Sequence, residues 1–336
     1  MAGKTRWKVV IPDRITGHAD VEAQVFGDAA EVIALGTPGT DGITPAVTAA
    51  VADADAVLVW HDLQWDAATI GALTRCKIIV RVGAGFDNVN LAAAREKGIV
   101  VCNVPDYGTH DVADHAIALL LSLARGLKGY DRRARSGDAG WTWEPTTAFR
   151  LTGKTFGVVG LGRIGTAAAM RAKAFGMRVI FYDPYRQDGW DKALGVTRVE
   201  SLDALAAASD VVSVHTPLTP ETRGMIGQRF FEQGKAGMAF INTARGPVVD
   251  WPAFRAAFLS GKVAAAGFDV LPVEPPDLHD ALLTRWVQED PTVADRLIIT
   301  PHSAFYSVEA EREMREKAAR EALGVLSGKA PRNKIN

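Results

Sequence analysis

The stretch FGVVGLGRIGTAAA, residues 156–169, is the most informative segment of this chain. An apolar run typical of a buried strand ends at Gly160, two more glycines follow at Gly162 and Gly165, and an alanine-rich segment comes next. This is a G-x-G-x-x-G turn between a predicted strand and a predicted helix, where the amides of residues 161–164 can face a pyrophosphate. The turn alone is weak evidence, because tight turns also use glycine only for its backbone freedom.

The next predicted strand, RVIFYD, supplies a second feature of a dinucleotide site. It ends in Asp183, at roughly the 20-residue distance where an acidic side chain accepts hydrogen bonds from the adenosine ribose. A carboxylate at this position also repels the 2′-phosphate of NADP(H). The sequence therefore favours NAD(H), with Arg186, three residues further on, working against that preference.

Apolar, β-branched runs alternate with alanine-rich helical segments along most of the chain, which predicts the α/β class with parallel sheets. The length of 336 residues and the 48% hydrophobic content allow two domains with separate cores. We expect a helix from about Thr109 to Lys128 that is too apolar to face solvent alone, and a final amphipathic helix that returns to the first domain. The expected strands are WKVVI, DAVLVW, KIIVRVG and GIVVCNV in the first hundred residues, then TFGVVG, RVIFYD, DVVSVHTP, AFINTA, AAAGFDV and RLIITPH.

The composition argues against several classes of partner. The net charge of −1, with basic residues spread along the chain, gives no face for nucleic acid. The longest apolar stretch, residues 116–124, is far short of the roughly 20 residues that span a bilayer, and the segment MAGKTRWKVVIPD lacks the long apolar region of a signal peptide. We expect a cytoplasmic protein without membrane contact, with Cys76 and Cys102 as inert buried thiols and no metal.

Three polar residues follow predicted strands in the second half of the chain: Arg245 after AFINTA, Glu274 after AAAGFDV and His302 after RLIIT. Ligands of open α/β sheets bind at the carboxyl ends of strands. Reduction of a 2-keto acid needs a cation for the carboxylate and carbonyl, which suits arginine, and a proton donor, which suits histidine. A carboxylate on the imidazole orients it and favours its protonated form, a role available to Glu274.

Taken alone, Arg245 also fits a surface ion pair, Glu274 a loop charge and His302 a hydrogen-bonded core or cap histidine. Their occurrence together after three successive strands makes these purely structural roles less favoured. His215 in VSVHTPLTPET is a rival histidine. Neither an arginine nor a glutamate accompanies it at comparable positions, so we interpret its loop as a wall of the cofactor site.

Several longer motifs, in order, resemble the D-isomer-specific 2-hydroxyacid dehydrogenase family. They are GLGRIG, FYDPY, HTPLTPETRGMI, INTARGPVVD, GFDVLPVEPP and ITPHSAFYS. The chain is most similar to the C-terminal-binding-protein branch, whose animal members are NAD(H)-dependent transcriptional corepressors, through the segments VWHDLQW, IIVRVGAGFDNVN, VVCNVPDYGTHDVADHA and FYDPYRQDGWDKALGV. The resemblance runs from about Val57 to the end of the chain.

The resemblance implies roles for individual residues. The family's catalytic arginine, glutamate and histidine fall on Arg245, Glu274 and His302. The substrate carboxylate is expected on the backbone amides of Val82 and Gly83 and on the Arg81 side chain, with His61 and Phe305 shaping the pocket. The expected cofactor contacts are Gly160, Gly162, Arg163, Ile164, Gly165, Asp183, His215, Thr216, Pro217, Thr222, Thr243, Asp269 and Thr109.

By the same resemblance, residues 1–105 and 305–336 form a substrate domain and 106–304 an inserted NAD-binding Rossmann domain. The two domains are then Rossmann-like or flavodoxin-like. The helix from Thr109 and the loop with Trp141 and Trp143 are expected to form the interface of a homodimer.

We expect hydride transfer between NAD(H) and a small 2-keto or 2-hydroxy acid. Alternatives are phosphite dehydrogenase, whose family keeps the arginine, glutamate and histidine, and an NAD(H)-sensing scaffold that binds peptides. Formate dehydrogenase is disfavoured, because its family carries glutamine where Glu274 stands. Ala84 and Phe305 depart from the branch's serine and tryptophan, so the resemblance leaves the substrate open.

Overall fold

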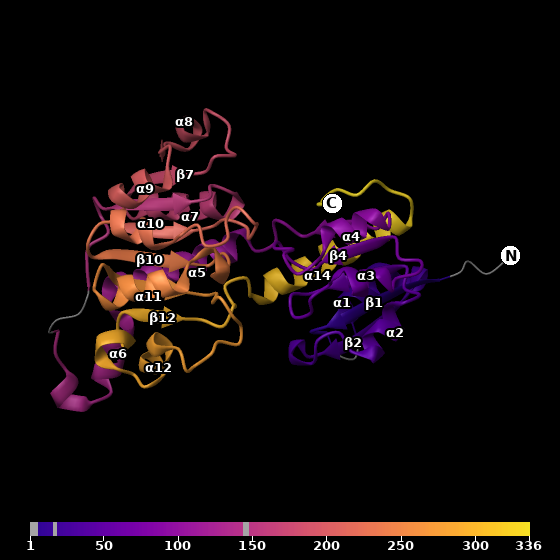
Figure 1. The fold of residues 1–336 in the computed structure, drawn as a ribbon, viewed down its shortest axis with the longest axis horizontal. Helices are drawn as coiled ribbons and strands as arrows, with labels where there is room; N and C mark the ends of the chain where they lie inside the picture. The colour runs from indigo at the N-terminus through magenta and orange to yellow at the C-terminus, as the bar shows by residue number, and fades with distance from the viewer. Residues whose placement is uncertain (1–5, 16–18, 144–147) are drawn as a thin grey trace. The chain divides into compact units, whose positions relative to one another are not determined.

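The computed structural model describes residues 6–15, 19–143 and 148–336. The chain divides into two units, each built around a parallel sheet. Unit 1 combines Met1–Gly108 with Tyr306–Asn336, so it draws on both the indigo and the yellow ends of the chain in Figure 1. Unit 2 is the continuous segment Thr109–Phe305. The predicted α/β class with two parallel sheets is confirmed.

Unit 1 contains a five-stranded sheet in the order β2-β1-β3-β4-β5, a flavodoxin-like order. All of its ladders are parallel. The fully buried central strands are continuous apolar runs, as expected for strands covered on both faces. The strands are β1 (Trp7–Asp13), β2 (Ala30–Thr37), β3 (Ala56–Val59), β4 (Ile78–Arg81) and β5 (Val100–Asn103). The helices are α1 (Asp20–Phe26), α2 (Pro45–Val51), α3 (Ala67–Gly71), α4 (Leu91–Glu96) and α14 (Val308–Leu326).

The last helix, α14, packs against α1 and the β3–β4 part of this sheet. Ser307 caps its N-terminus by accepting a hydrogen bond from the Ala310 amide, and acidic residues in its first turn suit the helix dipole. Arg315 of α14 bonds both oxygens of the buried Glu22 on α1. The end of the chain then lies beside β5, where Cys102 and Lys334 form an antiparallel bridge.

Unit 2 contains a seven-stranded parallel sheet in the order β12-β11-β10-β9-β6-β7-β8. From β8 to β11 this is the Rossmann order, with β12 added at the edge. The strands are β6 (Thr155–Val159), β7 (Arg178–Tyr182), β8 (Thr197–Arg198), β9 (Val211–Val214), β10 (Met238–Asn242), β11 (Val263–Phe268) and β12 (Leu297–Ile299). The helices are α5 (Thr109–Arg125), α6 (Leu127–Ala134), α7 (Arg163–Ala174), α8 (Trp190–Leu194), α9 (Leu202–Ala208), α10 (Gln228–Gln233), α11 (Trp251–Leu259), α12 (Ala281–Val287) and α13 (Pro291–Ala294).

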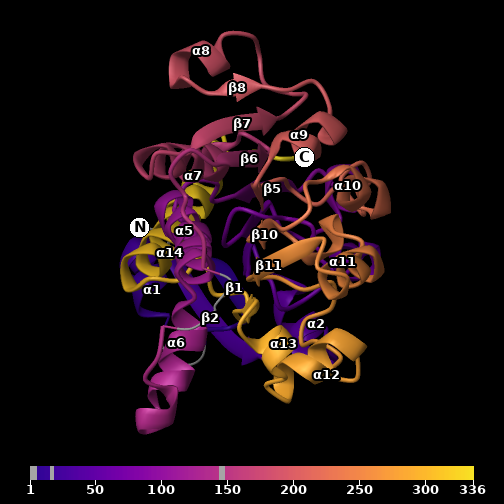
Figure 2. The same cartoon turned by 90° about the vertical axis from the view of Figure 1, so that its left-hand side faces the viewer.

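The two faces of this sheet have separate cores. Figure 2 shows α5 and α7 on one face and α10 and α11 on the other. The α11 face holds a set of touching aromatic rings that includes Phe240, Phe254 and Phe268, with the centroids of the last two 4.6 Å apart. The opposite core packs the apolar residues of α5 and α7 on the sheet, so most of α5 is covered.

The secondary structure corrects three expectations. The expected helix to Lys128 ends at Arg125, because Gly126 adopts the left-handed conformation (φ 62°) and α6 starts afresh at Leu127. Strand β2, sequence AEVIALGT, was not expected; it is an edge strand, and most of its residues are only half-buried. The two-residue strand β8 was not expected either.

No helix in the described part of the chain is both long and apolar enough to cross a membrane.

Candidate active site

The glycine turn of unit 2 is closely packed against the loop after β9. Gly160 has a φ of 89°, and a Cβ atom there would lie 2.9 Å from Thr216 Cγ2 and 3.0 Å from the His215 carbonyl oxygen. A Cβ at Gly165 would lie 2.1 Å from the Gly160 carbonyl oxygen, whereas one at Gly162 would meet open space. Gly160 and Gly165 are thus required by the close packing of the turn, whereas the absence of a side chain at Gly162 leaves open space beside the start of α7. Arg163 and Ile164 are the first two residues of that helix.

Buried hydroxyl groups without partners lie at the carboxyl ends of the neighbouring strands. Thr216 Oγ1 follows β9 and Thr243 Oγ1 follows β10, and neither hydroxyl has a hydrogen-bond partner among the described residues. Buried polar groups are normally paired, so these two atoms fit a site that a polar ligand completes. Thr222 does not share this feature, because its hydroxyl bonds the Pro217 carbonyl oxygen (2.7 Å) within the same loop.

His215 lies in the same loop and is unsuited to acid–base work. Its Nε2 is 2.8 Å from Ser213 Oγ, and its Nδ1 has no partner among the described residues. Burial lowers the pKa of the His215 imidazole to about 4, so the ring is neutral at pH 7. This agrees with its interpretation as a wall of the site.

Asp183 follows β7 and is held in place by two backbone amides. Its Oδ2 accepts a hydrogen bond from Leu161 N (2.8 Å) in the glycine turn, and its Oδ1 accepts one from Tyr185 N (3.0 Å). Arg186 donates from Nε to the Leu161 carbonyl oxygen (2.6 Å), and its guanidinium lies 4.9 Å from the ring centroid of Trp190. The Asp183 carboxylate therefore faces the glycine turn with a fixed cation nearby.

Glu274 and His302 are in direct contact. His302 Nδ1 lies 2.7 Å from Glu274 Oε2, and Glu274 Oε1 accepts a hydrogen bond from Leu271 N (2.8 Å). Both carboxylate oxygens are thus engaged, which fixes the carboxylate and the imidazole it contacts. The side chains remain partly accessible, at 22% for His302 and 36% for Glu274.

Arg245 lies three residues beyond β10 and next to this pair in the fold. Asn242 shapes its loop, with its side-chain amide donating to the Arg245 carbonyl oxygen (3.0 Å) and its Oδ1 accepting from Ala244 N (3.0 Å). A Cβ at Gly246 would lie 2.0 Å from the Leu271 carbonyl, so the Arg245 loop presses on the segment that holds Glu274. The structure thus gathers the loops of the three residues at the ends of adjacent strands.

Asp269, an expected cofactor contact, also holds the loop after β12 in place. It is 2% exposed, and its carboxylate accepts hydrogen bonds from Thr300 Oγ1, Ser303 N and Ala304 N. Thr109 is the first residue of α5, and Phe305 is the half-buried last residue of unit 2.

The remaining predicted residues belong to unit 1 and lie at the end of β4 or in the loops after β3 and β4. Arg81 is buried and donates from Nη1 to the Val82 carbonyl oxygen (2.9 Å). The Val82 amide donates to the Val59 carbonyl oxygen (2.7 Å), so it is used by the sheet and is not available to a carboxylate. Of the two amides expected to bind substrate, only that of Gly83 finds no acceptor among the described residues.

His61 sits in a loop that a buried aspartate supports. Asp13 accepts hydrogen bonds from Trp60 N (3.1 Å) and Asp62 N (3.2 Å), the residues on either side of His61. Burial raises the pKa of Asp13 to about 6. His61 Nε2 itself lies 2.8 Å from Arg14 Nη2.

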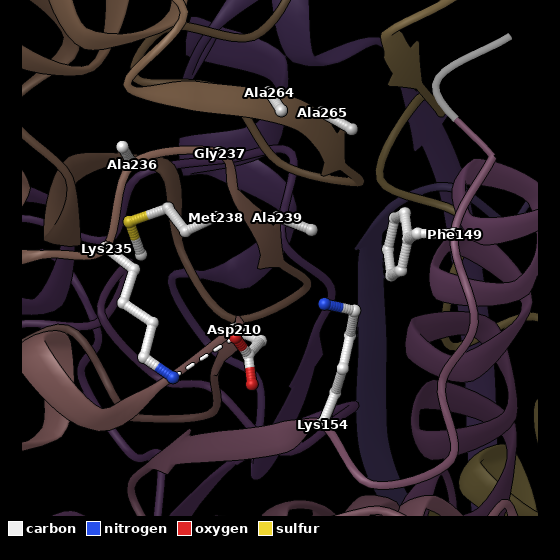
Figure 3. A pocket seen from close by; sticks show the side chains of 10 residues that line it. All are labelled: Phe149, Lys154, Asp210, Lys235, Ala236, Gly237, Met238, Ala239, Ala264 and Ala265. Carbon is white, nitrogen blue, oxygen red and sulfur yellow. Dashed lines mark hydrogen bonds and ion pairs between the residues drawn. The ribbon is translucent and has the colours of Figure 1, made fainter.

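The pocket in Figure 3 lies at the opposite edge of the unit 2 sheet. Its volume is about 260 Å³, and its lining comes from the amino-terminal sides of β9, β10 and β11 and the segment before β6. Lys235 pairs with Asp210 there (3.1 Å), and the Lys154 ammonium lies 5.8 Å from the Phe149 ring centroid. Because ligands of parallel sheets bind at the carboxyl ends, this pocket is separate from the candidate site.

The fold and the turn define a two-unit dinucleotide-binding protein, and comparison with known proteins identifies its family. The family model described as D-isomer specific 2-hydroxyacid dehydrogenase, NAD binding domain, matches residues 117–304. The chain belongs to this family of oxidoreductases, which act on CH–OH groups with a nicotinamide cofactor, so the predicted family is confirmed.

Individual relatives agree with this assignment. D-3-phosphoglycerate dehydrogenase of Archaeoglobus fulgidus is 39% identical over 84% of this chain, and the match spans only 51% of that protein. Glyoxylate reductase of Korarchaeum cryptofilum is 37% identical over 85% of this chain and 84% of its own length. The structure of D-lactate dehydrogenase from Aquifex aeolicus, complexed with NAD and lactic acid, has a TM-score of 0.81 and 28% identity over 95% of this chain and 96% of that chain.

Two residues of the site were not anticipated from the sequence. Thr300 and His115 contact each other (Nε2 to Oγ1, 2.9 Å), and Thr300 bonds Asp269. Thr300 could have been found from its place in the sequence, two residues before His302. His115 gave no signal, because it lies on α5, 185 residues away from its partner.

Proposed function

We propose that this chain is an NAD(H)-dependent D-2-hydroxyacid dehydrogenase that interconverts a small 2-keto acid and the corresponding 2-hydroxy acid. The observation that supports this most directly is the 2.7 Å contact between His302 Nδ1 and Glu274 Oε2 in the loops after β12 and β11. The proposed catalytic residues are Arg245, Glu274 and His302, which agrees with the prediction from the motifs.

Each side chain has one task in the proposed reduction. NADH, when bound, supplies the hydride that adds to C2 of the keto acid. The Glu274 contact engages Nδ1 of His302, which makes Nε2 the ring atom that delivers a proton to the developing alkoxide. Arg245 binds the substrate carboxylate and polarises the carbonyl, for which a planar, permanently charged guanidinium is suited. In the oxidation direction His302 accepts the proton instead.

The described residues also support the proposed cofactor. Thr216 Oγ1 and Thr243 Oγ1 offer buried, unpartnered hydroxyls, and the glycine turn offers the amides of residues 162–164 to the pyrophosphate. The Leu161 amide, which was predicted to belong to this set, is used by Asp183. Asp183 would accept hydrogen bonds from the adenosine ribose and disfavour a 2′-phosphate, so we propose NAD(H) over NADP(H). No group of three or more metal-binding side chains occurs within the described ranges, and the proposed chemistry uses none.

We further propose roles for the two units and a homodimer. Unit 2 is proposed to bind the cofactor, and the proposed substrate contacts within unit 1, as the resemblance implies, are Arg81, Gly83 and His61. The segment with Trp141 and Trp143, whose side chains are exposed by 79% and 86%, supports a subunit interface, because exposed apolar surface marks sites of protein interaction. The motifs quoted above support a position nearest the C-terminal-binding-protein branch.

The first test follows NADH oxidation by the purified protein with glyoxylate, pyruvate, hydroxypyruvate and bulkier phenyl-substituted 2-keto acids. We expect turnover that His302→Gln abolishes while NADH binding, measured by fluorescence titration, stays within about threefold. Retained turnover in His302→Gln would contradict its role. NADH formation from phosphite but not from 2-hydroxy acids would replace the proposal with phosphite oxidation, and NADH binding without any turnover would favour the sensing scaffold.

A further inference from the structure

A single buried residue, Asp269, holds the backbone of the proposed acid and of the two residues that follow it. Its carbonyl oxygen accepts a hydrogen bond from His302 N (2.8 Å). Its carboxylate accepts from Ser303 N at Oδ1 (2.9 Å) and from Ala304 N at Oδ2 (3.0 Å). The three consecutive amides after Pro301 are therefore all bonded to Asp269.

The loop needs this support because of its backbone conformation. His302 has a φ of 51°, in the left-handed region that side chains other than glycine rarely adopt. Such a conformation persists only where the surrounding bonds determine it. The position of the His302 imidazole thus depends on the bonds that Asp269 makes.

The Asp269 carboxylate in turn depends on Thr300 and His115. Thr300 Oγ1 donates a hydrogen bond to Asp269 Oδ1 (2.6 Å), so the single hydroxyl hydrogen of Thr300 points to Asp269. Thr300 Oγ1 must then accept from His115 Nε2, 2.9 Å away, which requires the proton of His115 on Nε2. His115 Nε2 is also 3.7 Å from Asp269 Oδ1, and the described part of the chain places no lysine or arginine within 4 Å of that carboxylate.

We propose that His115 is a positioning residue for the proposed acid. From α5 it donates to Thr300, orients the Thr300 hydroxyl toward Asp269, and so fixes the carboxylate on which the backbone of residues 302–304 is held. This inference rests on the proposed role of His302. It assigns to α5 a function in catalysis, in addition to its place in the core of unit 2.

The test compares two substitutions of His115 in the full-length protein. His115→Phe keeps an aromatic ring but removes the donor, whereas His115→Gln keeps an N–H donor at a similar reach. We expect His115→Phe to increase amide hydrogen exchange about tenfold at Ser303 and Ala304, because the loop opens locally more often. Exchange in the strands of unit 2 should not change. His115→Gln should stay close to the wild-type protein.

The kinetic effect should show the same pattern. With the best 2-keto acid, His115→Phe should lower kcat about tenfold while KM and the NADH dissociation constant stay within about threefold, since a displaced acid slows proton transfer without removing a binding contact. His115→Gln should recover most of kcat. Thr300→Val should lower kcat similarly, and the double variant His115→Phe/Thr300→Val should be no slower than either single variant.

Several outcomes overturn the inference. One is unchanged exchange at Ser303 and Ala304 in His115→Phe. Another is increased exchange throughout unit 2 together with a lower Tm, which indicates a role in stability only. A third is a His115→Gln variant as impaired as His115→Phe. If the wild-type protein turns over no 2-keto acid, the proposed function fails, while the exchange experiment still tests the support of the loop.

Discussion

Replacement of Glu274 by glutamine tests the pairing on which the proposed chemistry depends. Both carboxylate oxygens accept hydrogen bonds, Oε1 from Leu271 N (2.8 Å) and Oε2 from His302 Nδ1 (2.7 Å). Glutamine offers one acceptor oxygen, so one of the two N–H groups loses its partner. A hydrogen bond to a charged acceptor contributes about 1.5–3 kcal/mol. Because the Glu274 side chain is 36% exposed, solvent screening places the effect near the lower end, at about 1.5–2 kcal/mol.

This free energy applies mainly to the transition state, where the imidazole exchanges its proton. At about 1.4 kcal/mol for each factor of ten, kcat/KM of Glu274→Gln should fall roughly 10- to 30-fold. The assay is steady-state NADH oxidation with the best 2-keto acid, alongside a fluorescence titration of NADH, whose dissociation constant should not change. Glu200→Gln, an exposed glutamate of the same unit, is the matched control. A Glu274→Gln enzyme within twofold of the wild-type kcat/KM would refute the reasoning.

Three further predictions follow from the described contacts. Arg245→Lys should raise KM for the 2-keto acid about tenfold or more, because lysine cannot bind a carboxylate with two parallel bonds, and an unchanged KM would remove the proposed carboxylate contact. Asp183→Ser should raise the ratio of kcat/KM for NADPH to that for NADH, and Arg186→Gln should lower it, both measured by initial rates at limiting cofactor; a ratio that neither change moves would contradict the assignment of the adenosine site. The pKa of His215 falls from 6.5 to about 4 on folding, so its contribution to stability is complete above pH 6.5 and is lost as the pH falls toward 4. The free energy of unfolding should therefore drop by about 3 kcal/mol from this residue, and His215→Gln should flatten the acid side of the profile in urea titrations at pH 7, 5.5 and 4.5.

The proposed reacting residues could be anticipated because a simple rule places them. The loops after β10, β11 and β12 share one edge of the sheet, so residues far apart in the chain meet without any detailed knowledge of packing. The contact between Glu274 and His302 follows from this rule, together with the short loops that carry them. The glycine turn was predictable for the same reason, since its residues are consecutive.

Other features depend on register or on distant contacts, which the local sequence does not specify. Whether the amides of Val82 and Gly83 are free depends on how β4 lies against β3, and in the structure the Val82 amide bonds the Val59 carbonyl oxygen. The break at Gly126 was ambiguous because a single glycine is tolerated within a helix, and its left-handed φ of 62° is a property of the folded chain. Strand β2 could not be assigned from its sequence, because a short apolar run such as VIAL, residues 32–35, fits a strand or a helical segment equally well.

The carboxylates of Glu274 and Asp269 act on different parts of His302, and their effects on kcat/KM can be measured separately. Glu274 contacts the imidazole, whereas Asp269 bonds the backbone of residues 302–304 and is in turn contacted by His115 through Thr300. Loss of the Glu274 charge changes the energy of the protonated ring, and loss of the His115 donor changes where the ring lies. Because the two effects arise at different atoms, the reductions in kcat/KM of Glu274→Gln and His115→Phe should multiply in the double variant, giving roughly a 100-fold or larger loss. A double variant no slower than Glu274→Gln alone would mean that His115 acts through the same bond as Glu274, and that the backbone of the loop does not limit the reaction.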